Sequence, residues 1–212
     1  MTDVVTPLGP VTEGQIGKLN QNITARLNKK KSELPSDVFQ QVLGDETLID
    51  DIYAAIRKRV DAISACIIRT VKVDRKRTPK EVLKATGRNQ YVTDNVVAKM
   101  PKGEGDEVDV VFFKLGRYIS DNDLEKEYEL RGLIPADPYS VAAVNEADPA
   151  FADERPNGTH WKDKDGNWCF AAFIRWSGVR VVRVDRGVNA WNGRWWFAGL
   201  RKSASTSDTP AS

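Results

Sequence analysis

Residues 172–202 read AFIRWSGVRVVRVDRGVNAWNGRWWFAGLRK, and this stretch decides the fold of the C-terminal part of the chain. Apolar residues alternate with charged ones and are interrupted by turn residues, which is typical of short antiparallel strands. The pattern predicts strands at 167–176, 179–186 and 195–201, with turns at Ser177-Gly178 and 187–193. Immediately upstream, Asp165-Gly166 is a second hairpin signal that follows a short strand beginning at His160. The last quarter of the chain is therefore expected to be an antiparallel sheet.

Tryptophan and positive charge are concentrated in the same part of the chain. The 212 residues carry a net charge of only +2, yet residues 166–202 hold seven basic side chains against one acidic side chain. All six tryptophans also fall near this end: Trp161, Trp168, Trp176, Trp191, Trp195 and Trp196. Large rings bury much apolar area, so most of them are expected to pack between strands, with Trp176, Trp191, Trp195 and Trp196 as scaffold.

Composition excludes several classes of protein. Two cysteines and one histidine cannot build a disulfide framework or a four-ligand zinc site, and they argue against most histidine-based catalysis. No apolar run approaches the roughly 20 residues of a membrane helix, so membrane insertion is not expected. The opening MTDVVTPLGP lacks the charged and apolar regions of a secretory signal, and a cytoplasmic location is the default expectation.

The N-terminal quarter is predicted to be helical. Ile16, Leu19, Ile23 and Leu27 recur at helical spacing behind a capping Thr12, and a longer helix opens at Asp45. We therefore expect a flexible lead at 1–10, a helical region at 11–67, an α+β domain at 68–202 and a disordered tail at 203–212. The helical region is a candidate for homo-oligomerisation.

The middle of the chain mixes both element types. A strand is predicted to start at Ile68, and Thr78-Pro79 predicts a helix start. Further on, the pattern predicts a strand at 107–115, then helices at 121–131 and 138–146. Residues 148–158 are expected to form a connection.

Two groups of side chains suggest chemistry, and each has a simpler structural interpretation. His160, Asp163, Asp165 and Cys169 lie close in sequence and suggest a nucleophile with a base, but they also fit a hairpin turn and a strand core, which we favour. The run DKDGN hints at a calcium loop but lacks the closing Glu of an EF-hand. The sequence therefore predicts no metal, no cofactor and no enzyme.

The segment between Asp165 and Arg201 has an unusual composition. It contains no Lys, Glu, Gln or Met, although these four types make up 34 of the 212 residues. Strand alternation places Val179, Val181, Arg183 and Asp185 on one face of the strand 179–186, and this set has no uniform chemistry. Such a mixture is typical of a surface that is specialised neither for packing nor for one kind of charge.

At these residues the chain resembles the variable target proteins of diversity-generating retroelements, which have a C-type-lectin-like fold. In those families a reverse transcriptase mutates the adenines of a template repeat, mostly at AAY codons, and the copy replaces a C-terminal cassette. Changes in the first two bases of AAY do not reach Lys, Glu, Gln, Met or Trp. The body also resembles uncharacterised bacterial proteins with stretches like PADPYSVAAVNEADPAFADERPNGTHWKD and WWFAGLRK.

The resemblance divides the cassette, at about 170–199, into a fixed framework and exchangeable positions. The framework would include Phe173, Arg175, Arg180, Val182, Val184, Arg186 and the scaffold tryptophans. The exchangeable positions, which would form a variable ligand-binding face, are Ile174, Ser177, Gly178, Val179, Val181, Arg183, Asp185, Gly187, Val188, Asn189, Ala190, Asn192, Gly193 and Arg194.

The resemblance implies a binding protein whose partner is a macromolecule, expected to be a protein. The sugar-binding lectins' disulfides and calcium site have no counterpart here, so carbohydrate binding is not implied. The alternative function is a nucleic-acid-binding module that uses the arginine- and tryptophan-rich face, because arginine and aromatic side chains also grip phosphates and stack on bases.

Overall fold

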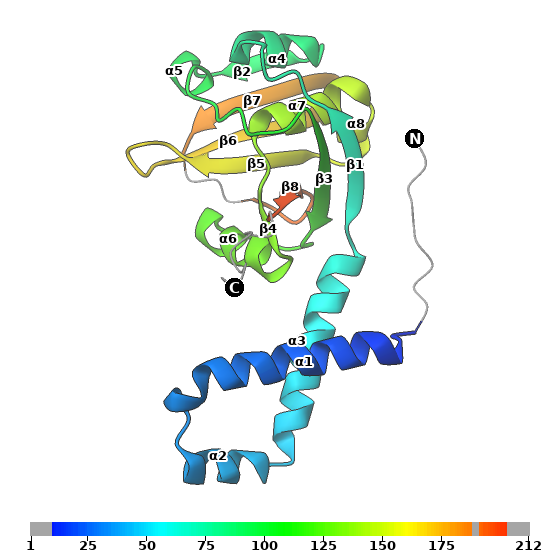
Figure 1. The fold of residues 1–212 in the computed structure, drawn as a ribbon. Helices are drawn as coiled ribbons and strands as arrows, with labels where there is room; N and C mark the ends of the chain where they lie inside the picture. The colour runs from blue at the N-terminus through cyan, green and yellow to red at the C-terminus, as the bar shows by residue number, and fades with distance from the viewer. Residues whose placement is uncertain (1–9, 188–190, 203–212) are drawn as a thin grey trace. The chain divides into compact units, whose positions relative to one another are not determined.

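A computed structural model describes residues 10–187 and 191–202, and its contacts divide the chain into two units, residues 1–60 and 61–212. The lead predicted at 1–10, apart from Pro10, and the tail predicted at 203–212 lie outside the described residues. Figure 1 shows the ribbon coloured along the chain. No helix in the described ranges has the length and apolarity needed to cross a bilayer.

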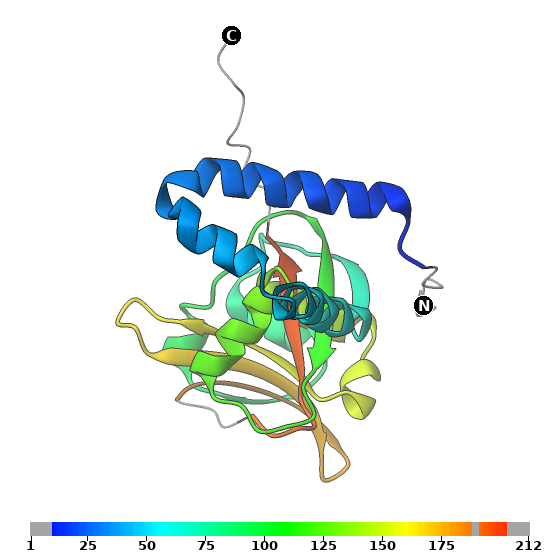
Figure 2. The same ribbon diagram turned by 90° about the horizontal axis from the view of Figure 1, so that it is seen from below.

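The first unit consists of helices, the last of which extends past residue 60, and two of them begin at or close to the predicted starts, behind Thr12 and two residues after Asp45. Helix α1 (Glu13–Lys30) starts behind a capping box in which Thr12 and Gln15 satisfy each other's backbone N–H groups. A short turn, η1 (Lys31–Glu33), leads to α2 (Ser36–Leu43), and Figure 2 shows the bend between α1 and α2. Helix α3 (Thr47–Ser64) follows. None of the residues in α1, α2 or α3 is buried.

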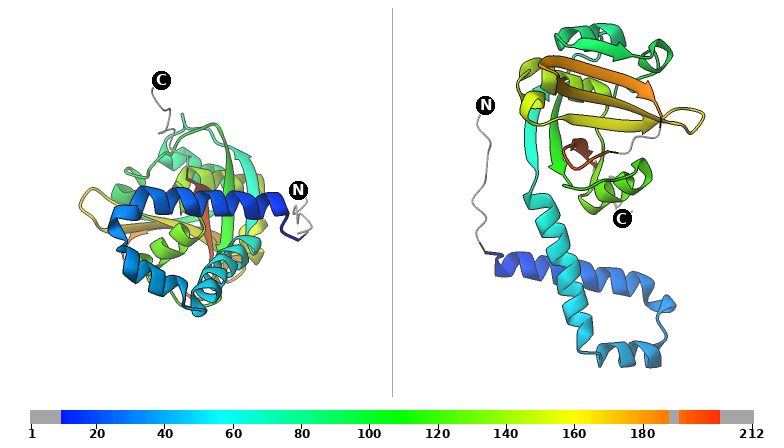
Figure 3. Two further views of the ribbon diagram at one scale, coloured as in Figure 1. Left: turned by 60° about the horizontal axis from the view of Figure 1, so that its bottom comes forward. Right: turned by 180° about the vertical axis from the view of Figure 1, so that it is seen from behind.

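The second unit is built on one mixed sheet. Among the described residues, eight strands pair in the order β1-β3-β8-β5-β6-β7-β2, with β4 attached to β8. The strands are β1 (Ile67–Lys72), β2 (Asn89–Val92), β3 (Glu107–Lys114), β4 (Leu133–Pro135), β5 (Asn157–Lys162), β6 (Trp168–Trp176), β7 (Val179–Arg186) and β8 (Trp196–Arg201). Figure 3 shows β5, β6 and β7 side by side, with the β5–β6 turn projecting beyond the sheet.

The sheet is not purely antiparallel, and this corrects the prediction. β6 pairs with β5 and β7 in antiparallel register, as the two hairpin signals indicate, but β2 runs parallel to β7 and β5 runs parallel to β8. The parallel partners are far apart in sequence, and β2 itself was not predicted because its four residues are mostly exposed and show no alternation. The fold is mixed α/β.

Helices cover both faces of this sheet. They are α4 (Pro79–Ala85), α5 (Asp94–Val97), α6 (Asp121–Leu130), α7 (Pro138–Ala147) and α8 (Phe151–Glu154). Residues of α4, α5, α7 and α8 join the first core, which also contains Phe173, Val182 and Val184. Residues of α6 join the second core on the opposite face, with Phe170, Trp191 and Phe197. Because strand side chains alternate, β6 contributes to both cores.

Candidate functional site

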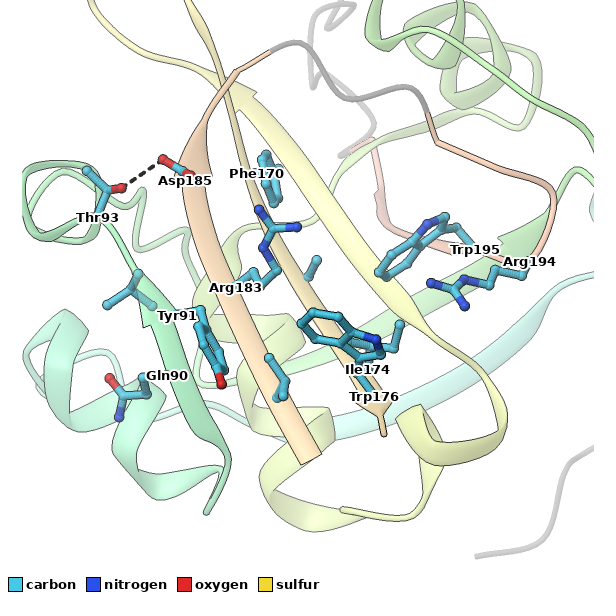
Figure 4. Close-up of a pocket in the computed structure, with 13 residues that line it drawn as sticks. Gln90, Tyr91, Thr93, Phe170, Ile174, Trp176, Arg183, Asp185, Arg194 and Trp195 are labelled. Carbon is cyan, nitrogen blue, oxygen red and sulfur yellow. Dashed lines mark hydrogen bonds between the residues drawn. The ribbon is translucent and has the colours of Figure 1, made fainter. Parts of the chain in front are cut away.

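A hollow of about 950 Å³ lies on the second face of the sheet, beside the second core. Figure 4 shows that β2, β6, β7 and the segment before β8 all contribute side chains to it. Its lining residues are Gln90, Tyr91, Val92, Thr93, Phe170, Ala172, Ile174, Trp176, Val181, Arg183, Asp185, Arg194 and Trp195. Ile174, Val181, Arg183, Asp185 and Arg194 are predicted exchangeable positions. The fold therefore brings these five together around one concavity.

Strand β7 separates the two kinds of position residue by residue. Val182 and Val184 are completely buried in the first core. Their neighbours Val181, Arg183 and Asp185 line the hollow on the other face. This is the alternation expected of a strand with one packed face. The framework residues of β7 thus support the fold, while the exchangeable residues line the concave surface.

The arginines at predicted framework positions and those at predicted exchangeable positions have different partners. Framework arginines are paired: Arg175 and Arg180 lie 3.3 and 2.8 Å from a carboxylate oxygen of Asp153, and Arg186 lies 2.7 Å from one of Asp163. The hydrogen bond from Arg180 is the main cause of the lowered pKa of Asp153. These arginines attach the sheet to α8 and to the β5–β6 turn.

The two exchangeable arginines have aromatic neighbours instead. The guanidinium of Arg183 lies 5.7 Å from the centre of the Phe170 ring, and that of Arg194 lies 5.8 Å from the centre of the Trp195 ring. Among the described residues, neither arginine has a carboxylate within ion-pair distance. Both side chains are exposed at the hollow.

Strand β2 forms one wall of the hollow, and Thr93, which follows it, holds the side chain of Asp185. Tyr91 is the register partner of Arg183 on β7. After the end of β2, Thr93 donates its backbone N–H to the carbonyl of Val184 at 2.9 Å. Its hydroxyl donates to Oδ1 of Asp185 at 2.7 Å. Sequence reasoning missed Gln90, Tyr91 and Thr93, because their role depends on a parallel pairing across about 90 residues.

The other predicted exchangeable positions differ in exposure and in backbone conformation. Ile174 and Val181 are only 7% and 2% exposed, so they form the floor of the hollow. Val179 is exposed at the start of β7, and Ser177, Gly178 and Gly187 have positive φ angles at turns. Asn192 is half-buried, and its side chain accepts the backbone N–H of Arg194 at 3.1 Å. Val188, Asn189 and Ala190 lie outside the described residues.

Gly193 stands apart from the other exchangeable positions. A Cβ atom added there would lie 2.6 Å from the carbonyl carbon of Gly116, which is closer than real Cβ atoms approach backbone. Any other residue would force two backbone segments apart. Gly193 is therefore a close-packing position, which does not suit the exchange predicted for it.

The scaffold tryptophans are not equivalent either. Trp191 is 1% exposed and packs edge-on against Phe170, Trp195 and Phe197 in the second core. Trp195 and Trp196 are half-buried. Trp176, however, is 62% exposed and lines the hollow, so it does not act as packed scaffold. It is the last residue of β6 on the face of Phe170 and Ile174, where the described residues leave its ring largely open.

A buried polar network connects His160, Asp121 and Trp191. His160 is 1% exposed, and its Nδ1 lies 2.8 Å from Oδ1 of Asp121. The same oxygen accepts a 2.9 Å hydrogen bond from Nε1 of Trp191. The Nε2 atom of His160 lies 2.9 Å from Oε1 of Glu125, and the Trp168 ring stacks on the imidazole at 4.5 Å. The network joins α6, β5 and the cassette.

Asp163 and Cys169 have the turn and core positions that the sequence favoured for them. Asp163 accepts the backbone N–H groups of Asp165 and Asn167 in the β5–β6 turn, at 3.0 and 2.9 Å. Cys169 is buried in the first core, where burial raises the pKa of its thiol. Among the described residues, no three His, Cys, Asp or Glu side chains are arranged to hold a metal ion. The partners of His160 on α6 were not predicted.

Comparisons with known protein families, curated proteins and solved structures found no match to this chain.

Proposed function

We propose that this protein is a recognition protein that binds a macromolecular partner, a protein, through the hollow formed by β2, β6, β7 and residues 191–195. One observation supports the proposal most strongly: residues that the sequence predicts to be exchangeable lie around the hollow. Five predicted exchangeable residues line one hollow, while the predicted framework residues of β7 enter the core or form ion pairs. A surface of this kind accepts new side chains without loss of the fold.

The residues that line the hollow support protein recognition. The cores of protein–protein interfaces are enriched in aromatic residues and arginine. This hollow has aromatic walls in Phe170, Trp176 and Trp195 and polar groups in Arg183, Asp185 and Arg194. Trp176 offers an exposed ring of the kind that dominates binding energy at protein interfaces.

We also propose an origin for the variable face. A retroelement would diversify the cassette, and the mixed α/β unit would serve as a C-type-lectin-like display scaffold. The absence of Lys, Glu, Gln and Met between Asp165 and Arg201 supports adenine-directed exchange.

The experiment that tests this origin is to sequence the genomic neighbourhood of the gene. We expect a reverse-transcriptase gene and a near-copy of the cassette that carries AAY codons at the exchangeable positions. Gly193 is a useful internal control, because we expect the near-copy to carry a glycine codon there as well, since a Cβ atom would clash with the backbone of Gly116. A neighbourhood with neither element would contradict the retroelement origin.

The N-terminal helices carry a second proposal, self-association with another copy of the chain. Leu19 and Ile23 of α1 are 38% and 37% exposed, and Ile49 and Tyr53 of α3 are 67% and 62% exposed. Apolar residues at three- and four-residue spacing favour helix packing, and these stripes have no buried member in α1, α2 or α3. A helical partner would bury them.

Charge indicates that the partner is a second copy. The end of α1 is basic, with Arg26, Lys29 and Lys30, whereas the start of α3 is acidic, with Asp50 and Asp51. One unit thus carries both charge signs, so two copies are complementary. Self-association would also present several recognition faces together and increase avidity.

Light scattering of the full chain tests this proposal. We expect a dimer or larger species that falls to the monomer mass in the L19K/I23K variant, because two charges would interrupt the apolar stripe of α1. The matched control Q21K/N22K adds the same charges to the same helix and should keep the assembly. A monomeric wild-type protein, or an L19K/I23K variant of unchanged mass, would refute the proposal.

A further inference from the structure

The hollow contains two cations for which the described residues supply no acidic partner. Arg183 on β7 and Arg194 before β8 lie on either side of it, as Figure 4 shows. Neither has a carboxylate within ion-pair distance among the described residues, in contrast to Arg175, Arg180 and Arg186. Water solvates both guanidinium groups while the hollow is open.

A partner that covers the hollow must replace this water. Burying an arginine without hydrogen-bond acceptors is costly, and the neighbours of these two arginines are mainly aromatic rings. The hollow's own acid, Asp185, uses its Oδ1 to accept from the Thr93 hydroxyl and from the backbone N–H of Arg186 at 2.8 Å, and among the described residues it forms no ion pair with either arginine. The acceptors must therefore come from the partner.

We infer that the hollow binds an acidic segment of a protein partner, whose Asp or Glu carboxylates pair with Arg183 and Arg194. The inference rests on the proposed recognition function and names the chemistry of its ligand. Planar guanidinium groups form paired, charge-assisted hydrogen bonds with carboxylates, which are among the strongest in proteins. The exposed rings of Trp176 and Tyr91 then contact apolar atoms of the same segment.

The observations favour an acidic protein segment over a nucleic acid. Single-stranded nucleic acids follow a basic track that spans several nucleotides. Here two arginines that lack a carboxylate partner within the described ranges face one compact hollow, and Asp185 in its wall repels a run of phosphates. Acidic side chains on a loop need only one or two cations and can pair with the arginines without a continuous run of charge past Asp185.

The test is a selection from a phage-displayed library of disulfide-constrained seven-residue loops on the full-length protein. We expect the selected loops to be enriched in Asp and Glu. Synthetic copies should bind the R183S/R194S variant about ten- to a hundredfold more weakly, which is the loss expected for hydrogen bonds to charged groups. The control K76S/K84S removes two exposed positive charges outside the hollow and should leave binding within twofold. The double charge reversal R183D/R194D should select basic loops instead.

Three results would overturn the inference in distinguishable ways. Loops that lose affinity for a W176A variant but carry no acidic bias would refute the acidic ligand and leave the recognition function intact. Selected loops that ignore every substitution in the hollow, or the absence of any selected loop, would refute both. Tighter, salt-sensitive binding of a single-stranded dT20 oligonucleotide would favour the nucleic-acid alternative. Arg183, Arg194 and Trp176 are exposed, so these variants are expected to fold.

Discussion

Replacing Asp121 by alanine is expected to lower the free energy of unfolding by about 3–5 kcal/mol, the usual cost of removing one partner from a buried ion pair. The Asp121 carboxylate is 2% exposed and accepts from both His160 and Trp191. Its removal leaves a buried imidazole and a buried indole N–H without this acceptor. Chemical unfolding followed by tryptophan fluorescence measures the change.

The matched control is Asp123→Ala, two residues further along the same helix. The Asp123 side chain is 54% exposed and pairs with Ser120 and Lys126 at the surface. Exposed pairs of this kind contribute roughly 0–1 kcal/mol. An Asp121→Ala variant no less stable than the Asp123→Ala variant would contradict the role given to the buried network.

The same network makes the free energy of unfolding depend on pH. Burial lowers the pKa of His160, but the hydrogen bonds and charges of Asp121 and Glu125 outweigh it, so this pKa is raised above its usual 6.5. The added stability is therefore fully present below about pH 6.5 and is lost as the pH rises through the raised value. In the Asp121→Ala variant this loss should become smaller, and a slope identical to that of the wild-type protein would oppose the assignment.

Introducing aspartate at two adjacent positions of β7 should give opposite results. Val182→Asp places a carboxylate in the first core at a site with no exposed surface, and the second unit should fail to fold or lose more than about 4 kcal/mol. Arg183→Asp changes a side chain exposed at the hollow, and stability should stay within about 0.5 kcal/mol. Thermal unfolding measured by circular dichroism distinguishes the two.

The pair Val184→Asp and Asp185→Asn repeats this comparison one step along β7. Val184 is completely buried, and we expect its substitution to be as severe as that of Val182. Asp185→Asn keeps an oxygen that accepts from Thr93 and should be mild. Equal losses at neighbouring positions would mean that the cassette has no tolerant face.

Local signals predicted much of the fold because they act over a few residues. Thr78-Pro79 does begin α4, where Thr78 and Glu81 form a capping box. The alternation of 179–186 correctly separated the core side of β7 from its open side, since the period of a strand is independent of distant partners. Capping signals were sufficient for most helix starts, and turn dipeptides together with strand alternation were sufficient for the hairpins.

Features that depend on distant pairing were not predicted. The polar strand β2 exists because β7 offers it a parallel partner, and the wall formed by Tyr91 and Thr93 follows from that pairing. The contact between Asp121 and His160 joins residues 39 positions apart. Trp176 looked like scaffold because tryptophan is usually packed, but its exposure depends on what the rest of the fold places over β6.

The most direct test of the central claim is the distribution of substitutions among natural copies of this gene in related strains. We expect changes to concentrate at the residues that line or border the hollow, namely Ile174, Val179, Val181, Arg183, Asp185 and Arg194. We also expect Arg180, Val182, Val184, Trp191 and Gly193 to stay fixed, because they form ion pairs, core or close backbone contacts. Substitutions spread evenly over both sets, or concentrated in the second, would contradict this claim.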